Sequence, residues 1–381
     1  MVDSERLAEI FKRLVQIDSI SRKEGAIAKV LEEIFRSMGA ETVFDGAGLK
    51  VESNTGNLIA RFQGTKHVPP LLLNAHMDTV KPGEGIKVRF SDGLFTSDGT
   101  TVLGGDDKSA LAVIIEAIRV LQERKVPFAP LEIVLTICEE IGLLGAKKLD
   151  YSLLKARCGY SLDATDTEGI VTRAPAANRF DLTVYGRDAH AGAAPEKGIN
   201  AIQVASRAIS GLSIGRIDEE TTGNIGLING GTATNVVPDK VKVAGEVRSH
   251  NLKRLSDETD KIIRAFEHEV SVYRETFPSD DGLPRLESQI YQDFPAMNIP
   301  EDHMVVDLAR EAASNLGSNM EPKTSGGGSD ANIFFEHGIV CGILGTGMQD
   351  VHTVRESIRL ADMVKSVELL VELIEAYTRR A

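Results

Sequence analysis

Two glutamates, Glu139 and Glu140, stand side by side in "ICEEIGLLGA", directly after an apolar run that is typical of a buried strand. Like charges at the end of a core strand repel each other, and both resist leaving water. The pair therefore indicates chemistry at the end of this strand.

Three more segments place ionisable side chains at the ends of apolar runs. His76 and Asp78 follow "LLLNA", Asp163 lies near the end of "CGYSLDA", and His352 lies in a loop after "GIVCGILG". Sites in open α/β sheets form beyond the carboxyl ends of the strands, so we expect these groups to meet at one edge. Taken alone, His76 would be a capped loop histidine. Asp78, two residues on, could instead fix its tautomer.

Asp106 and Asp107 occupy the start of a predicted helix in "LGGDDKSA". The segment resembles a phosphate-binding loop, but that motif needs Gly immediately before Lys-Ser. One Asp suffices to cap a helix, which leaves the other free to bind a cation. Carboxylates and imidazoles without a thiolate suit Zn²⁺, with Mn²⁺ or Co²⁺ as possible substitutes.

The elements that must position these residues alternate between helical and strand patterns. Apolar residues at helical spacing predict helices over 7–15, 27–38 and 108–124, and apolar runs predict strands over 57–62, 70–75, 131–137 and 158–164. This alternation predicts an α/β fold with a mixed, mostly parallel sheet flanked by helices.

A change of pattern after about residue 172 predicts a second domain. The segments 179–187, 224–231 and 240–249 alternate with period two, with helices predicted over 199–209 and 252–270. The first pattern resumes with helices over 303–315 and 361–377. We therefore expect a catalytic domain formed by residues 1–174 and 296–381, with a smaller α+β lid or dimerisation domain inserted at 175–295.

Composition excludes several classes of protein. The net charge is −13, no basic run is present, and no stretch approaches the roughly 20 apolar residues of a membrane span, so we expect neither a nucleic-acid nor a membrane partner. The N-terminal segment is amphipathic rather than a signal peptide. The three cysteines are scattered, which fits a cytoplasmic protein without a disulfide framework.

Nine motifs in order resemble the di-zinc exopeptidase and amidohydrolase family that includes tripeptidase T, carboxypeptidase G and aminoacylase. They are "NAHMDTV", "LGGDDKSA", "ICEEIGLLGA", "YSLDA", "GRDAHAGAAPEKGINA", "TNVVPD", "EVRSH", "GGGSDAN" and "VHTVRE", and they cover nearly the whole chain. The stretch 100–108 is most similar to the tripeptidase T branch.

The resemblance implies a role for each residue of the predicted site. It implies two Zn²⁺ per chain, held by His76 and Asp163, by Glu140 and His352, and by Asp106 as the bridge between them. Asp78 would orient His76, and Glu139 would be the general base for a metal-bridging hydroxide. Asp107 is expected to be a helix-start residue.

The resemblance also implies a substrate class. We expect an aminopeptidase or tripeptidase acting on short peptides, and the alternative is a deacylase or desuccinylase acting on N-acyl amino acids with the same metals. A binding protein with a vestigial site is a third reading, which the complete ligand set and Glu139 disfavour.

Further residues of the inserted domain and a late glycine run complete the expected site. In the family, a histidine equivalent to His190 binds the oxyanion, often in the partner subunit, so the resemblance implies a homodimer formed through the inserted domain. Asn235 and Arg248 are candidates for substrate contact, although Arg248 could equally form a strand-end salt bridge. Tripeptidase T has Arg where this chain has Gly326, and Gly327 and Gly328 could offer backbone amides to a carboxylate instead.

Overall fold

The computed structural model describes residues 1–277 and 281–380. The chain divides into two compact units. The first unit comprises Met1–Arg173, Met297–Ser325 and Ser329–Ala381, and the second comprises Ala174–Ala296 together with Gly326–Gly328.

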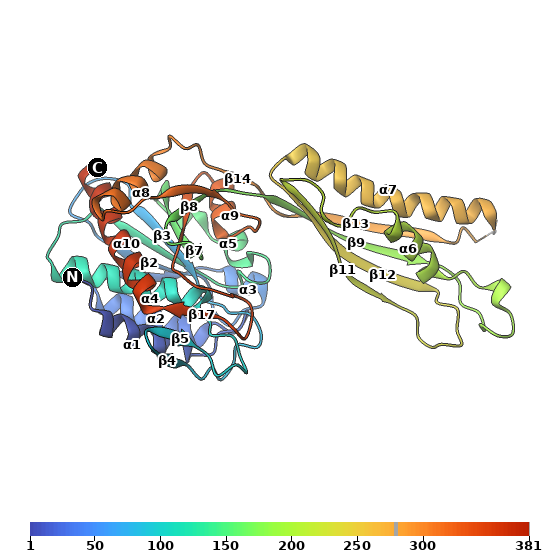
Figure 1. Ribbon diagram of the computed structural model, residues 1–381, viewed down its shortest axis with the longest axis horizontal. Helices are drawn as coiled ribbons and strands as arrows, with labels where there is room; N and C mark the ends of the chain where they lie inside the picture. The colour runs from blue at the N-terminus through green and yellow to red at the C-terminus, as the bar shows by residue number, and fades with distance from the viewer. Residues whose placement is uncertain (278–280, 381) are drawn as a thin grey trace. The chain divides into compact units, whose positions relative to one another are not determined.

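A nine-stranded mixed sheet forms the centre of the first unit (Figure 1). Its order is β1-β2-β6-β3-β7-β16-β8-β14, with β15 beside β8. Strands β6, β3, β7 and β16 run parallel. Strand β2 is antiparallel to both β1 and β6, and β8 is antiparallel to β16 but parallel to β15. The strands are β1 Glu41–Phe44, β2 Leu58–Phe62, β3 Leu71–His76, β6 Leu131–Thr136, β7 Cys158–Ala164, β8 Gly169–Ala174, β14 Met297–Asn298, β15 Glu321–Thr324 and β16 Val340–Gly345.

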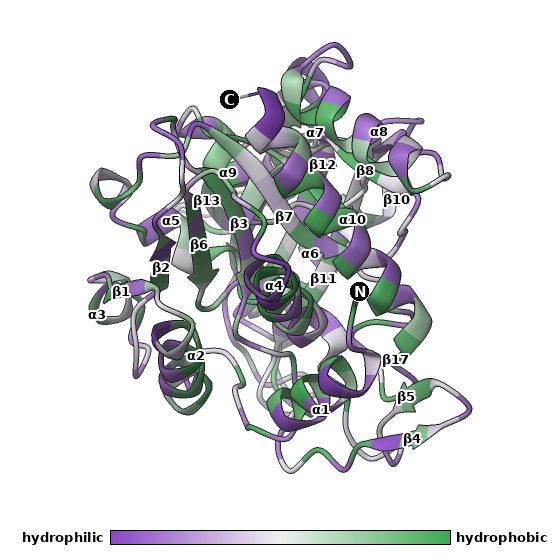
Figure 2. Cartoon of the chain, turned by 90° about the vertical axis from the view of Figure 1, so that its left-hand side faces the viewer, coloured by the Kyte–Doolittle hydropathy of each residue, from purple (hydrophilic) through white to green (hydrophobic). Residues whose placement is uncertain are grey.

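Helices cover this sheet, and every residue of β3 and β6 is buried, which requires cover on both faces. The hydropathy colouring shows β3 and β6 as a hydrophobic centre (Figure 2). Helix α4 packs against β3 and β7, with α1 and α10 against α4. The helices are α1 Ser4–Val15, α2 Gly25–Ser37, α3 Ala47–Val51, α4 Gly105–Glu123, α5 Leu144–Lys148, α8 Met304–Asn315, α9 Asp330–Glu336 and α10 Leu360–Arg380, with a 3-10 turn at Tyr151–Leu153. The predicted α/β class is confirmed.

A small antiparallel sheet adjoins this core. Its order is β17-β5-β4, formed by β4 Arg89–Ser91, β5 Leu94–Thr96 and β17 Ser357–Arg359. Strand β17 follows directly on the loop that carries His352, so this sheet fixes one end of that loop.

The second unit is a five-stranded antiparallel sheet of order β10-β11-β12-β9-β13, with helix α7 lying along it (Figure 1). Its core joins one face of the sheet to α6 and α7 through residues such as Phe180, Val243 and Phe266. The elements are β9 Ala176–Tyr185, α6 Ala201–Ser210, β10 Gly215–Arg216, β11 Thr221–Gly230, β12 Lys240–Ser249, α7 Leu252–Thr276 and β13 Arg285–Phe294, with a 3-10 turn at Pro195–Lys197.

Strand β13 was not predicted. Most of its side chains are exposed, so the sequence "RLESQIYQDF" carries no apolar alternation that would mark a half-buried strand. It pairs with β9 over nearly its whole length. Backbone pairing, rather than side-chain burial, therefore places this strand.

Candidate metal centre

The predicted ionisable residues of the first unit gather at the carboxyl ends of parallel strands. His76 is the last residue of β3, Asp163 is next to last in β7, and Glu139 and Glu140 follow β6. His352 lies in the loop after β16, and Asp106 lies at the start of α4. The rule for open α/β sheets therefore predicted the location correctly.

Asp106 lies between the two histidines. Its Oδ1 is 3.0 Å from Nε2 of His76, and its Oδ2 is 3.1 Å from Nε2 of His352. Nε2 of His352 is also 3.0 Å from Oε2 of Glu140. Ligand atoms of His76, Asp106 and Glu140 all lie within 4.8 Å of one another, close enough to hold a metal ion.

A second group comprises Asp106, Asp107 and Asp163, whose carboxylate oxygens also lie within 4.8 Å of one another. Asp107 is fully buried, and its Oδ2 accepts a hydrogen bond of 3.1 Å from the backbone N–H of His76. Its φ and ψ of −119° and 25° are not helical, and its side chain bonds β3 rather than the first turn of α4. The expectation that Asp107 merely starts the helix therefore misses its contact with a strand end.

Asp78 connects the strand end to the two glutamates. Its Oδ1 accepts a 2.9 Å hydrogen bond from the backbone N–H of Glu139, and its Oδ2 accepts bonds from Ser21 Oγ and from the N–H of Glu140. Nδ1 of His76 lies 2.9 Å from the backbone carbonyl oxygen of Asp78 and 3.5 Å from its carboxylate. The predicted contact with His76 is thus made most closely by the backbone of Asp78.

The two glutamates stand in different surroundings. Glu140 contacts His352, whereas no described residue forms a hydrogen bond with the Glu139 carboxylate. Burial and the nearby charge of Asp163 raise the pKa of Glu139 well above its usual value. Burial also raises the pKa of Glu140, although the hydrogen bond to His352 opposes that shift. The Glu140 carboxylate therefore has a hydrogen-bond partner, whereas the Glu139 carboxylate has none among the described residues.

Burial and mutual charge shift the pKa values of several acids and both imidazoles in this site. Burial opposes the charging of His76, but hydrogen bonds to Asp106 and Asp78 outweigh it and raise its pKa. Hydrogen bonds to Asp106 and Glu140 raise the pKa of His352 to about 10. Burial and the charge of Asp106 raise the pKa of Asp163 well above its usual range. Buried carboxylates this close together are costly unless cations compensate their charge.

Two buried carboxylates that were not predicted hold the backbone of the site. Glu356 accepts hydrogen bonds of 2.8 to 2.9 Å from the N–H groups of Leu103, Gly104 and Asp106. Glu24 accepts a 2.9 Å bond from the N–H of Cys138, which has a left-handed φ of 53° just before Glu139. Burial raises the pKa of Glu356, although the hydrogen bonds from those backbone amides oppose the shift.

Asp330 is a third buried carboxylate whose position was not predicted, and it binds side chains. It begins α9, is buried, and accepts hydrogen bonds from Thr136 and Asn74. Burial raises its pKa to about 6. Asp330 lies in the "GGGSDAN" motif. Its burial next to the end of β6 could not be predicted from the sequence, so its place in the site was missed.

In the second unit, His190 and Asn235 lie together. The N–H of Ala191 donates a 2.9 Å hydrogen bond to the carbonyl oxygen of Asn235. Nδ1 of His190 accepts bonds of 3.1 Å from the N–H groups of Gly192 and Ala193. A neutral imidazole therefore carries its proton on Nε2, which makes that atom a donor.

Arg248 is bound within the second unit. Its Nε and Nη2 contact the Glu246 carboxylate at 2.9 and 3.1 Å, and its guanidinium lies 5.7 Å from the centre of the Phe294 ring. Its Nη1 reaches the carbonyl oxygen of Gly326 at 3.5 Å. A Cβ on Gly328 would lie 2.4 Å from the Phe294 ring, so only glycine fits there. Gly327 lies between these two contacts.

The chain belongs to peptidase family M20/M25/M40, whose model matches residues 72–376. A relative, the uncharacterized protein YqjE of Bacillus subtilis strain 168, is 41% identical over 98% of this chain and 99% of its own length. The predicted family resemblance is thereby confirmed. No helix in the described part of the chain is long and apolar enough to cross a membrane.

Two solved structures share the fold over almost the whole chain. The aminopeptidase PepT from Bacillus cereus ATCC 10987 is 39% identical, with a TM-score of 0.87, over 98% of this chain and 99% of that one. A tripeptidase from Staphylococcus aureus subsp. aureus Mu50 is 36% identical, with a TM-score of 0.91, over 100% of both chains.

Proposed function

We propose that the chain is a metal-dependent aminopeptidase that removes the first residue of short peptides. The observation that carries this proposal is the pairing of a compact His and carboxylate cluster with Glu139, a buried carboxylate that no described residue engages. The names of the solved relatives, an aminopeptidase and a tripeptidase, support the substrate class.

The residues present fit divalent cations. Oδ1 of Asp107 and Oε1 of Glu140 are buried and have no hydrogen-bond partner among the described residues. A buried carboxylate oxygen is costly unless a proton or a cation compensates it. His76 and Asp163 would hold one cation, Glu140 and His352 the other, and Asp106 would bridge them. Imidazole and carboxylate ligands suit two Zn²⁺, with Mn²⁺ or Co²⁺ as substitutes.

The chain's own residues would divide the proton transfers. Bound divalent cations supply Lewis acidity, which polarises a carbonyl and acidifies water. Glu139 would accept the proton of the attacking water, because it is the free carboxylate, and then deliver it to the departing amine. Asp78 would hold the backbone of Glu139 and Glu140 at fixed positions through the bonds described above.

His190 would donate from Nε2 to the oxyanion, in the active site of its own chain or of a partner. The exposed strand β11 supports a homodimer, because Leu227 and Ile228 are 62% and 50% exposed on it. Strand β10 pairs with β11 only at Thr222 and Gly223, so the rest of this edge can accept a second copy. Arg248, Asn235 and the Gly327–Gly328 amides would contact the peptide.

Release of amino acids from tri- and dipeptides, compared with N-acyl amino acids, tests the proposal on protein reconstituted with Zn²⁺, Mn²⁺ or Co²⁺. We expect turnover of the peptides. Intact tripeptides beside rapid turnover of acyl amino acids would establish the deacylase instead.

A further inference from the structure

A pocket of about 500 Å³ adjoins the metal centre within the first unit. Three loops form it: one between α1 and α2, one after β3 and one after β6. Its lining residues are Ile20, Ser21, Arg22, Thr79, Val80, Lys81, Glu140, Ile141 and Leu144. Glu140 belongs both to this lining and to the contact with His352, so the pocket opens beside the reacting centre.

The wall of this pocket is mainly aliphatic, supplied by Ile20, Val80, Ile141 and Leu144. Ile141 directly follows Glu140 and is 40% exposed, so its apolar side chain is accessible to a ligand in this pocket. Small-molecule pockets have this composition, an apolar lining with a few polar groups.

The same loops that line the pocket also hold the metal centre. Ser21 donates a 2.7 Å hydrogen bond to Asp78, and Val80 follows Asp78 by two residues. The pocket is thus fixed relative to Glu139 and Glu140, since Asp78 binds both of their N–H groups. A side chain held here would set the position of the bond to be cleaved.

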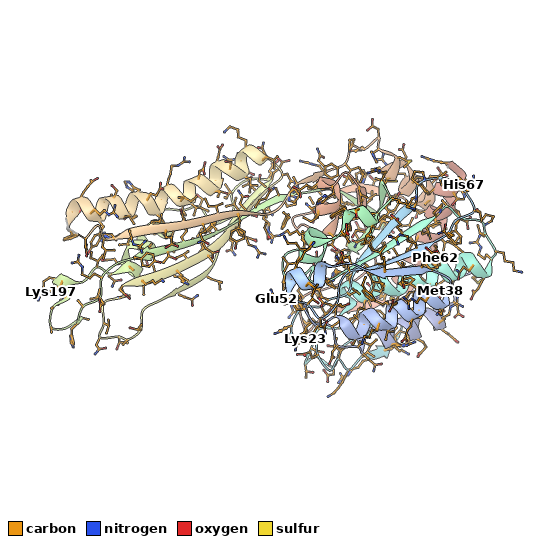
Figure 3. The ribbon with its side chains drawn as sticks, turned by 180° about the vertical axis from the view of Figure 1, so that it is seen from behind. Lys23, Met38, Glu52, Phe62, His67 and Lys197 are labelled. Carbon is orange, nitrogen blue, oxygen red and sulfur yellow. The ribbon has the colours of Figure 1, made fainter. Side chains whose placement is uncertain are left out.

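Arg22 gives the rim a positive charge. Its φ of 75° is left-handed, and its backbone is held by a 3.0 Å bond to Glu24 and a 3.1 Å bond from Asn54. The nearest ion pair of its guanidinium is Glu52, at 3.9 Å. Lys23 and Glu52 mark this edge of the first unit in Figure 3. Lys81 adds a second positive charge to the lining. Glu140, the acid of this lining, is paired with His352, so the pocket disfavours cationic side chains.

We infer that this pocket binds the side chain of the first residue of the peptide, and that it selects medium-sized aliphatic residues over alanine and over lysine. This inference rests on the proposed function. An aminopeptidase attacks the carbonyl of the first residue, whose side chain begins only two bonds from the attacked carbon. That side chain must therefore lie in a space next to the metal ligands, and the pocket beside Glu140 is such a space.

Three tripeptides that differ only in their first residue, Leu-Gly-Gly, Ala-Gly-Gly and Lys-Gly-Gly, test this specificity. We expect kcat/KM for the leucine peptide to exceed that for the alanine peptide by about tenfold or more, the range that one to three buried methylene groups supply. Lysine should be the poorest of the three.

Ile141→Ser should reduce the leucine-to-alanine ratio at least about fivefold, because it removes part of the aliphatic wall. Metal content, counted by atomic emission, should stay unchanged. Arg22→Gln should raise the relative kcat/KM for the lysine peptide about tenfold. Leu316→Ser is the matched control, since Leu316 is similarly exposed, at 44%, and does not line the pocket. It should leave the ratios unchanged.

The outcomes separate the two proposals. If the metal-loaded protein cleaves none of the tripeptides, the proposed function is wrong and this inference falls with it. If tripeptides are cleaved but the leucine-to-alanine ratio is near one, or survives Ile141→Ser, the aminopeptidase stands and the pocket assignment is overturned.

Discussion

Glu139 and Glu140 are adjacent residues with separate surroundings, and the difference gives a direct test of their roles. We predict that Glu139→Gln abolishes turnover and keeps both metals, because an amide of the same shape cannot accept a proton. Glu140→Gln should lose one metal, since a neutral amide is a poor zinc ligand. Metal counting and a peptide assay on both proteins decide the matter. Equal metal loss in the two variants would mean that the roles are shared or exchanged.

His190 belongs to the second unit, and its Nε2 is free to donate. We predict that His190→Ala lowers kcat about 10²–10³-fold, the usual effect of losing one oxyanion donor. Metal content should not change, and KM should move little if the contact forms mainly in the transition state. A near-normal kcat would return His190 to a structural role.

Mixed dimers of His190→Ala and Glu139→Gln chains test whether the histidine acts across subunits. If it does, mixing should restore activity in up to about half of the sites, because one site then combines a good base with a good donor. Verified mixed dimers without activity would place His190 in the site of its own chain.

At the residue scale, the sequence was sufficient where chemistry imposes a motif. His76, Asp106, Glu140 and His352 were predicted and lie in mutual contact. Glu356 was not predicted, because its role depends on amides that are distant in sequence and become its neighbours only in the fold. Asp107 lies in the first turn of α4, as expected, but its bond to the end of another strand was not predicted, for the same reason.

Among the elements, the loop before α4 depends on a partner from the opposite end of the chain. We predict that Glu356→Ala weakens metal binding about 10–100-fold, the usual cost of losing support behind a ligand, because the amide of Asp106 loses its acceptor. Titration with a chelator as competitor measures this affinity.

Glu132→Ala provides the control for that variant. Glu132 is as buried as Glu356 and also accepts backbone N–H bonds, from Lys155 and Ala156, but it lies toward the other end of β6. Both substitutions should lower the melting temperature, and only the change at Glu356 should lower metal affinity. Equal metal affinities in the two variants would contradict the assignment.

Elements with a buried face were predicted well, whereas strand β13 was not predicted. The helix predicted over 252–270 is observed as Leu252–Thr276, and that predicted over 303–315 as Met304–Asn315. Most side chains of strand β13, by contrast, are exposed, so its sequence carries no apolar alternation. Periodicity reports burial, so an element held by backbone pairing escapes it.

For the whole molecule, the raised pKa values of His76 and His352 make stability depend on both pH and metal. A group whose pKa is raised on folding stabilises the fold below its unfolded pKa, near 6.5 for histidine, and loses this effect as pH rises toward the folded value. Burial lowers the pKa of Lys108 to about 7. This single group should therefore make the stability of the fold rise with pH, opposite to the effect of the histidines. We expect the combined effect of the two histidines on stability to exceed that of Lys108.

We therefore predict that the melting temperature of the metal-free protein falls as pH rises from about 6.5 to 9. Metal should restore stability increasingly over the same range, because binding displaces protons from both imidazoles. Calorimetry in buffers of different ionisation enthalpy should detect on the order of two protons released per chain at neutral pH. Metal uptake without proton release would disprove this linkage.

The bond between Gly104 and Glu356 joins residues that are 252 positions apart in the chain. Ribosomes add about 5–20 residues each second, so the strands that carry His76 and Glu140 leave the ribosome many seconds before the segment that carries His352 and Glu356. Until that segment has been made, Asp106 has neither the His352 imidazole as a neighbour nor the Glu356 carboxylate that accepts its backbone N–H. If the proposed metal centre forms, the newly made chain would acquire its full affinity for metal only near the end of its synthesis, and metal uptake would mark the completed folding of the first unit.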